Sequence, residues 1–235
     1  MEIFLKSLIE YIDRLSSMIE EDRFKEITRE EIALVLNGIE FEEKQEICNT
    51  LQDKLLLLED PELAFELAAN VYWIDLEKCA DVVVASGDVE CNYYYARDIE
   101  GANVKRHGEV IINSGDAEYN YLFAKDVDEA DIKSHGKVVM DSGSVWYNYM
   151  FVLDVNGSDI KGHGKVIIDK KDVYYNYVFA SEITGSDVQA HCGVILESLE
   201  KDKYISRVKE EKQYHMFSSL GIPSFSKVKK NGDKR

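Results

Sequence analysis

One interval organises most of this chain, because polar and aromatic residues recur every 28 positions. Four asparagines and four histidines keep this spacing without an insertion: Asn92, Asn120, Asn148 and Asn176, and His107, His135, His163 and His191. A short unit repeated in this way is typical of an array in which each unit packs mainly against its two neighbours. The repeat therefore constrains the fold more than any other feature.

Each 28-residue unit contains the signals of two short helices. Asp131 precedes one apolar-periodic segment and Asp116 precedes the other, both as good N-caps, while Gly115 and Gly143 stand where a helix-ending glycine belongs. A β-solenoid built from runs such as Val166-Ile167-Ile168 is the alternative, and it explains the caps less well. We predict an all-α fold: a right-handed α-solenoid of about five helical hairpins.

The repeat divides the chain into three predicted segments. Residues 1–59 form an N-terminal helical cap, with Thr28 starting a capping box and residues 51–58 as a helix interior. Residues 60–199 hold five repeats, of which the first is degenerate because Ala64 and Cys79 replace Asn and His. Residues 200–235 supply a C-terminal capping helix and a basic tail.

The segment from Ser114-Gly115-Asp116 to Ile132 carries a family resemblance. It resembles the α-solenoids, broadly the HEAT-like helical-hairpin repeats, and is more closely similar to an uncharacterised bacterial and phage repeat of the form SGDxxYxYxFAxDVxGADI. The resemblance extends over residues 60 to about 199. It implies a stacked helical scaffold with a binding role, and it implies no enzymatic activity.

The repeated Asn and His side chains are expected to point inward. On a helical wheel, Asn120 lies at the centre of the apolar arc and His135 lies on the apolar side of its own helix. A buried polar group without a partner costs about 1–3 kcal/mol, so we expect Asn and His to hydrogen-bond to each other as a structural ladder. Two alternatives remain: a histidine metal site, which helix spacing disfavours, and an exposed asparagine ladder that grips an extended peptide.

Glycine and tyrosine repeat with the same period. Gly108, Gly136 and Gly164 lie mid-helix, where glycine ordinarily costs about 1 kcal/mol, and so they predict close contact between helices. The recurring tyrosines are expected to fill the core, with a ligand-stacking platform as the alternative: Tyr93, Tyr121, Tyr149 and Tyr177.

The net charge of −17 argues against direct binding of nucleic acid. Residues 201–235 contribute +6, so residues 1–200 carry −23, and this acidic body favours a basic protein partner. Charges interrupt the first residues, no segment is long and apolar enough to span a membrane, and the four cysteines lack a CxxC spacing. We expect a cytoplasmic protein without cofactor or metal.

Function should lie where the repeats differ on their outer face. Glu90 and Glu118 give way to Trp146 and Tyr174 at the same repeat position, and Lys125 gives way to Leu153. Large apolar residues on an outer face are typical of an interface. We predict a partner-binding surface, with packing against the C-terminal segment (Ile205, Met216 and Phe217) as the competing explanation: Trp146, Met150, Leu153, Tyr174, Asp126 and Asp154.

These features favour a non-enzymatic binding scaffold, because no catalytic or phosphate-binding motif is present. Its most concrete form is an acidic inhibitor or immunity-type protein that occludes a basic nucleic-acid-binding enzyme, such as a nuclease or defence effector, by mimicking nucleic acid. Alternatives are an assembly scaffold with an apolar patch, and an enzyme using His135 and Asp126. The sequence does not specify the oligomeric state.

Overall fold

The computed structural model describes residues 36–37 and 41–210, and within them every regular element is a helix. The prediction of an all-α fold is confirmed for this part of the chain. In chain order the helices are α3 (Phe41–Leu56), α4 (Pro61–Asn70), α5 (Leu76–Ser86), α6 (Val89–Asp98), α7 (Val104–Ser114), α8 (Ala117–Asp126), α9 (Ile132–Ser142), α10 (Val145–Asp154), α11 (Ile160–Lys170), α12 (Val173–Glu182), α13 (Val188–Glu197) and α14 (Lys201–Glu210).

The helices begin and end at the residues that the sequence signals mark. The Asp88 carboxylate accepts a 2.7 Å hydrogen bond from the Cys91 amide at the start of α6, and Asp131 caps α9 in the same way. At the other end, Gly87 and Gly143 adopt the left-handed conformation, with φ of 69° and 67°. The caps satisfy backbone groups that a short helix otherwise leaves unbonded.

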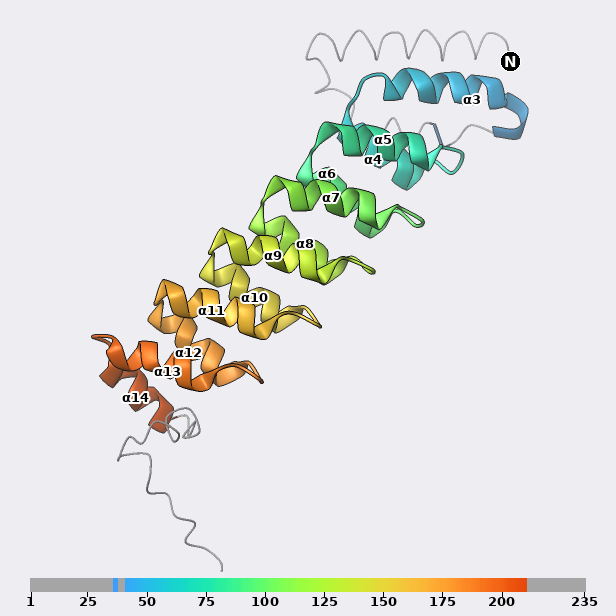
Figure 1. Cartoon of the computed structure of the whole chain (residues 1–235). Helices are drawn as coiled ribbons and strands as arrows, with labels where there is room; N and C mark the ends of the chain where they lie inside the picture. Colours follow the sequence, from blue (N-terminus) through green and yellow to red (C-terminus); the bar gives the residue numbers. More distant parts are fainter. Residues whose placement is uncertain (1–35, 38–40, 211–235) are drawn as a thin grey trace, which may run out of the picture. The chain divides into compact units, whose positions relative to one another are not determined.

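The chain forms two compact units. The first contains residues up to Ser114 together with 126–130; in it α4 packs against α5 and α6 against α7, as antiparallel pairs (Figure 1). The helix α4 also lies beside α6, and α5 lies between α3 and α7, so the helices form two layers. The space between them is filled by a cluster that includes Leu51, Leu55, Leu63, Leu67, Val83 and Tyr95.

The second unit contains residues 115–125 and those from 131 onward, and it is built in the same way. Here α10 pairs with α11 and α12 with α13. One layer places α10 beside α12, the other places α11 between α9 and α13, and α14 packs on α13. The fully buried side chains Phe151, Ile167, Phe179 and Ile195 come from successive helices, so each helix contributes one large residue at the same depth.

One boundary was predicted too late in the sequence. The apolar run 51–58 suggested a single helix interior, but α3 ends at Leu56 and Leu57 is 80% exposed. Glu59 turns the chain with a φ of 54° before Asp60 caps α4. Thr28, Met216 and Phe217 lie outside the described residues, whereas Ile205 of α14 is half-buried against the core of the second unit.

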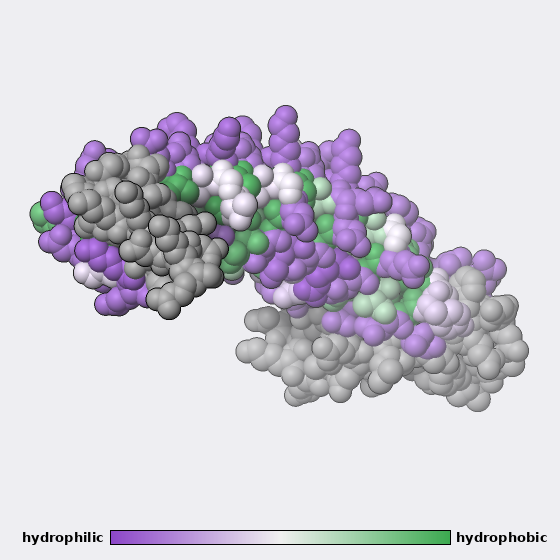
Figure 2. All heavy atoms as spheres, turned by 90° about the horizontal axis from the view of Figure 1, so that it is seen from below, coloured by the Kyte–Doolittle hydropathy of each residue, from purple (hydrophilic) through white to green (hydrophobic). Residues whose placement is uncertain are grey.

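On the face drawn in Figure 2, hydrophobic side chains lie between hydrophilic ones. The seven large hydrophobic residues that are exposed within the described chain are Leu57, Tyr72, Leu76, Trp146, Leu153, Tyr174 and Leu199. Among the described residues, no helix has the length and apolarity needed to cross a membrane. A candidate binding surface is therefore expected where several of these seven residues lie close together.

Candidate functional site

The recurring Asn and His residues form four buried hydrogen-bonded pairs. The distance from the Asn Oδ1 atom to the Nδ1 atom of the His fifteen positions later is 2.8 Å for Asn92–His107, Asn120–His135 and Asn148–His163, and 2.7 Å for Asn176–His191. All eight side chains are almost completely buried, with exposures of 0–1%. The expected pairing of Asn with His is thus present in every complete repeat.

The bonds of Asn148 fix the protonation of its partner His163. The Asn148 Nδ2 group donates to the carbonyls of Ser144, at 2.7 Å, and Val139, at 3.0 Å. Both amide hydrogens are then used, so Oδ1 can only accept, and the proton on the imidazole must lie on Nδ1. One pair therefore joins three helices: α9 through the Val139 carbonyl, α10 through Asn148 and α11 through His163.

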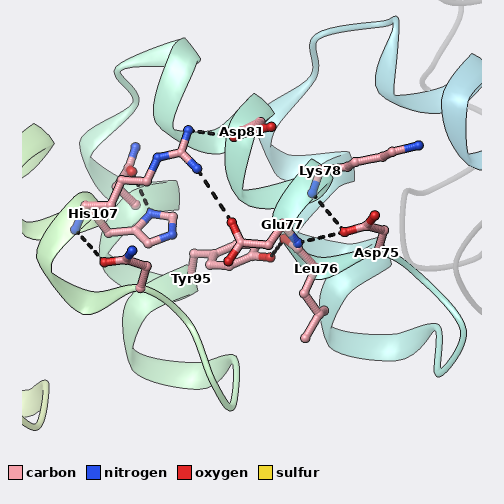
Figure 3. Close-up of polar contacts among 10 residues, drawn as sticks. Asp75, Leu76, Glu77, Lys78, Asp81, Tyr95 and His107 are labelled. Atoms are coloured by element: carbon pink, nitrogen blue, oxygen red, sulfur yellow. Dashed lines mark hydrogen bonds and ion pairs between the residues drawn. The ribbon is translucent and has the colours of Figure 1, made fainter.

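Each imidazole also packs on an aromatic ring, and those of His163 and His191 face a glycine of a neighbouring helix. His163 stacks on Phe151 with 4.8 Å between ring centroids, and its Nε2 atom faces Gly136 of α9. In the first unit Tyr95 takes the place of Phe; it stacks on His107 at 4.7 Å, and its hydroxyl donates to the Leu76 carbonyl (Figure 3). Gly136 and Gly164 are therefore contact points between consecutive helices, as their spacing predicts.

These histidines are buried bases that stay neutral at pH 7. Burial lowers the pKa of all four from 6.5 to about 4, because desolvation disfavours the imidazolium. The Nε2 atoms of His107, His163 and His191 are covered and have no hydrogen-bond partner in the part of the chain described. Across the same residues, no three His, Cys, Asp or Glu side chains gather closely enough to hold a metal ion. The four imidazoles thus lie where solvent does not reach them.

A second set of side-chain bonds runs along the other layer, from tyrosine to carboxylate. The Tyr93 hydroxyl donates to Asp126 at 2.8 Å, Tyr121 donates to Asp154, and Tyr149 donates to Glu182 at 2.5 Å. The two carboxylates expected to bind a partner, Asp126 and Asp154, therefore each accept a bond from an intrachain tyrosine while remaining exposed to solvent. These bonds were not predicted from the sequence, although acids recur with the repeat at 98, 126, 154 and 182.

Exposed aromatic and aliphatic residues gather on α10 and α12. Trp146 is 46% exposed, Leu153 46% and Tyr174 49%; we call these three residues the aromatic patch. Trp146 and Leu153 lie two turns apart on one side of α10, with the half-buried Met150 between them. Tyr175 bridges the two helices, because its ring contacts both Trp146, at 6.3 Å, and Tyr174, at 5.2 Å. The predicted apolar residues are thus neighbours on adjacent helices.

A hollow of about 490 Å³ lies on the opposite layer, between α11 and α13. Ile160, Ile168 and Lys165 line one side, and Ser186 and Asp187 line the other. The Ser186 Oγ and His191 Nε2 atoms beside it are both covered. The hollow therefore offers mainly aliphatic surface and charged side chains at its rim.

The predicted site residues thus fall into two sets: a buried Asn and His set, and a surface set composed of the aromatic patch, Met150 and two carboxylates. No protein-family model matches this chain, and comparisons with curated proteins and with solved structures found no match. The surface set is the one whose side chains can reach another molecule.

Proposed function

We propose that this protein is a non-enzymatic scaffold that binds a basic protein partner through the aromatic patch. The observation that carries the proposal is the clustering of Trp146, Leu153 and Tyr174, each close to half-exposed, on two adjacent helices. Tryptophan and tyrosine dominate the binding energy of many protein interfaces, because they bury large areas at a small entropic cost. Packing within the described residues leaves about half of each of these side chains accessible.

The electrostatic surroundings support a basic partner. The carboxylates of Asp154 and Glu182 stand at the ends of α10 and α12, and Tyr147 hydrogen-bonds to Glu118. The whole chain carries a formal charge of −17. Such a surface accelerates the encounter with a cationic protein and weakens binding as salt rises.

The narrower form of the proposal is an inhibitor or immunity-type protein of the cytoplasm that occludes a nucleic-acid-binding enzyme. The proposed scaffold is a right-handed α-solenoid of about five hairpins in residues 60–199, with residues 1–59 and 200–235 as caps. Support comes from the 28-residue period and from the two-layered packing of helix pairs within each unit. The acidic body would then occupy the site that nucleic acid uses on the enzyme.

Affinity capture from the native host, followed by titration of each purified partner at increasing salt, tests the proposal. A basic partner should bind the wild-type chain at low salt and lose affinity steadily as salt rises. The double variant Trp146→Ala with Tyr174→Ala should lower the affinity at least tenfold, whereas Leu199→Ala, at a fully exposed position outside the patch, should not. Partners that are all neutral or acidic, or affinity that the double variant leaves unchanged, would refute it.

The exposure of Leu153 favours a second candidate, an assembly scaffold that binds a neutral partner by apolar contact. Binding of that kind would survive high salt, since burial of apolar surface is not screened. The same titration separates the two: an affinity that is independent of salt but sensitive to Leu153→Ala would select the assembly scaffold.

A further inference from the structure

The chain contains its own example of how this layer binds a cation. In α6 the Arg97 guanidinium lies 5.0 Å from the centroid of the Tyr93 ring and 4.7 Å from that of Tyr94. It makes two hydrogen bonds of 2.7 Å to the Asp98 carboxylate and donates to the Tyr93 hydroxyl at 3.1 Å. The tyrosine hydroxyl in turn donates to Asp126. Ring, hydroxyl and carboxylate together form an arginine cage.

The residue at the repeat position of Arg97 loses its charge in later repeats. In α8 the residue equivalent to Arg97 is Lys125, whose ammonium lies 5.7 Å from the Tyr121 ring. In α10 the equivalent residue is Leu153, which has no charge. Part of the cage around it persists, since Tyr149 and Asp154 stand where Tyr93 and Asp98 stand in α6, whereas Met150 replaces Tyr94. The repeat has therefore kept one ring and the carboxylate, and it has leucine in place of the cation.

Within the described residues, the Tyr149 hydroxyl and the Asp154 carboxylate of α10 have no cation as a partner. The Tyr149 hydroxyl donates to Glu182, as Tyr93 donates to Asp126, but within the described residues no cation reaches the Tyr149 oxygen. The Asp154 carboxylate accepts the Tyr121 hydroxyl through Oδ2, and no ion pair to it forms among those residues. Trp146 adds a ring that α6 lacks, because the equivalent residue there is Glu90. The site in α10 thus combines aromatic rings with a carboxylate that no cation of the described residues pairs with.

We propose that the aromatic patch binds an arginine side chain of the partner, in the role that Arg97 fills within the chain at α6. The guanidinium lies beside Leu153, where the Asp154 carboxylate accepts its hydrogen bonds, and the rest of the arginine side chain extends over Met150 towards Trp146 at the start of α10. Arginine fits better than lysine because its planar group stacks on aromatic rings and bonds a carboxylate through two donors. This inference rests on the proposed function and specifies the residue that the basic partner contributes.

Two charge-matched peptides test the preference on the full-length chain. One is an alanine-based helical peptide with arginines on one face, and the other is the same peptide with lysine in place of arginine. Calorimetric titration should give an affinity for the arginine peptide about tenfold higher than for the lysine peptide. Asp154→Asn should remove that preference and Trp146→Ala should weaken the binding of both peptides, whereas Tyr72→Ala, which changes an exposed aromatic residue outside the patch, should leave binding intact.

A self-blocking variant makes the test sharper. Leu153→Arg restores next to Asp154 the Arg-Asp pair that occurs natively at 97 and 98, and its guanidinium should occupy the site from within the chain. The arginine peptide should then bind about tenfold more weakly than to Leu199→Arg, which adds the same charge at a fully exposed position. Equal weakening by the two variants would indicate that only net charge matters.

The outcomes separate this inference from the function on which it rests. If neither peptide binds at low salt, the basic-partner function itself fails. If both bind equally and Leu153→Arg matches Leu199→Arg, a basic partner is still supported and the arginine site is refuted. If the wild-type chain sediments as a dimer and Trp146→Ala sediments as a monomer, the patch binds a second copy of the chain and the inference is overturned. Lys227, Lys229 and Lys230 can all be changed to Gln, both in the wild-type chain and in Trp146→Ala. If this change raises the affinity for the arginine peptide in the first background but not in the second, the chain's own basic segment occupies the site and the inference is overturned.

Discussion

The Nε2 atom of His163 lies against Gly136, so that a methyl group built on this glycine would stand 3.3 Å from the nitrogen. The same methyl group would stand 3.2 Å from Cε1 of Phe151, the ring on which His163 stacks. Both neighbours are fully buried and cannot move aside easily. Three residues from three helices therefore set the distance between α9 and α11.

Gly136→Ala should destabilise the protein by about 1 kcal/mol, because the steric conflict with Phe151 and His163 outweighs the helix propensity gained. Gly193→Ala is the matched control, since Gly193 is also inside a helix but a Cβ there has no atom within 4 Å. That variant should gain up to about 1 kcal/mol. Urea unfolding of both variants measures the difference, and stabilisation by Gly136→Ala would contradict the close contact.

Acidification should destabilise the fold steeply. In the unfolded chain these four histidines take up protons near pH 6.5, whereas burial lowers their pKa in the folded chain to about 4. Between these values the unfolded state binds more protons, so the free energy of unfolding falls as pH falls and levels off below about 4. The slope is at most about 1.4 kcal/mol per pH unit for each histidine, and urea unfolding between about pH 7 and 5 measures it.

A variant that lacks one pair calibrates that slope. Asn148→Leu combined with His163→Leu removes one of the four buried imidazoles, and so the slope should fall by about a quarter. A slope unchanged by the double variant would show that other groups cause the acid sensitivity. The measurement should stay above about pH 5, because carboxylates begin to titrate below it.

The pair Asn148 and His163 should show strong energetic coupling. Asn148→Leu alone leaves the buried Nδ1–H group of His163 without an acceptor and should cost on the order of 3 kcal/mol. The double change to leucine should cost less than the sum of the single changes, by about 1–3 kcal/mol. In the first repeat both members of the pair are already replaced, by Ala64 and Cys79, and both of these side chains are fully buried. Additive costs in a double-mutant cycle would disprove the coupling.

Lys171→Gly should stabilise the protein by about 0.5–1 kcal/mol. Lys171 ends α11 with a φ of 56°, in the position that Gly87 and Gly143 occupy after α5 and α9. A side chain in this left-handed conformation is strained, and glycine is not. Gly115→Ala tests the converse, because its φ is 72° and a methyl group there meets no atom within 4 Å. Thermal unfolding should shift upward for the first variant and downward for the second.

Much of the fold could be predicted because its signals are local. The caps at Asp88 and Asp131 and the glycines at 87 and 143 mark helix ends in the sequence itself. The wheel also identified the inward Asn and His, since their position depends only on helical periodicity. The end of α3 at Leu56 was missed, because the leucines that follow continue the apolar run while the backbone turns at Glu59.

The surface site was only partly predictable. The exposure of Trp146 and Tyr174 follows from their place on the helical wheel and from the charged residues at that position in earlier repeats. The bond from Tyr121 to Asp154 and the cage around Arg97 could not be predicted from the helical wheel. They depend on which side chain of a neighbouring helix or turn comes within reach. Periodicity assigns a residue to a face, but it does not specify its partner across the interface.

The bonds of Asn148 extend no further than the helices immediately before and after it, and Asn92 and Asn176 use equivalent groups. If residues 144–171 were excised, Asn176 would find the Val139 carbonyl where it now finds that of Ile167, a chemically identical acceptor. Tandem duplication or loss of 28 residues in the gene would therefore create no orphaned polar group at the new junction. The length of the protein can therefore change by whole repeats, and the number of Asn–His pairs in the core changes with it.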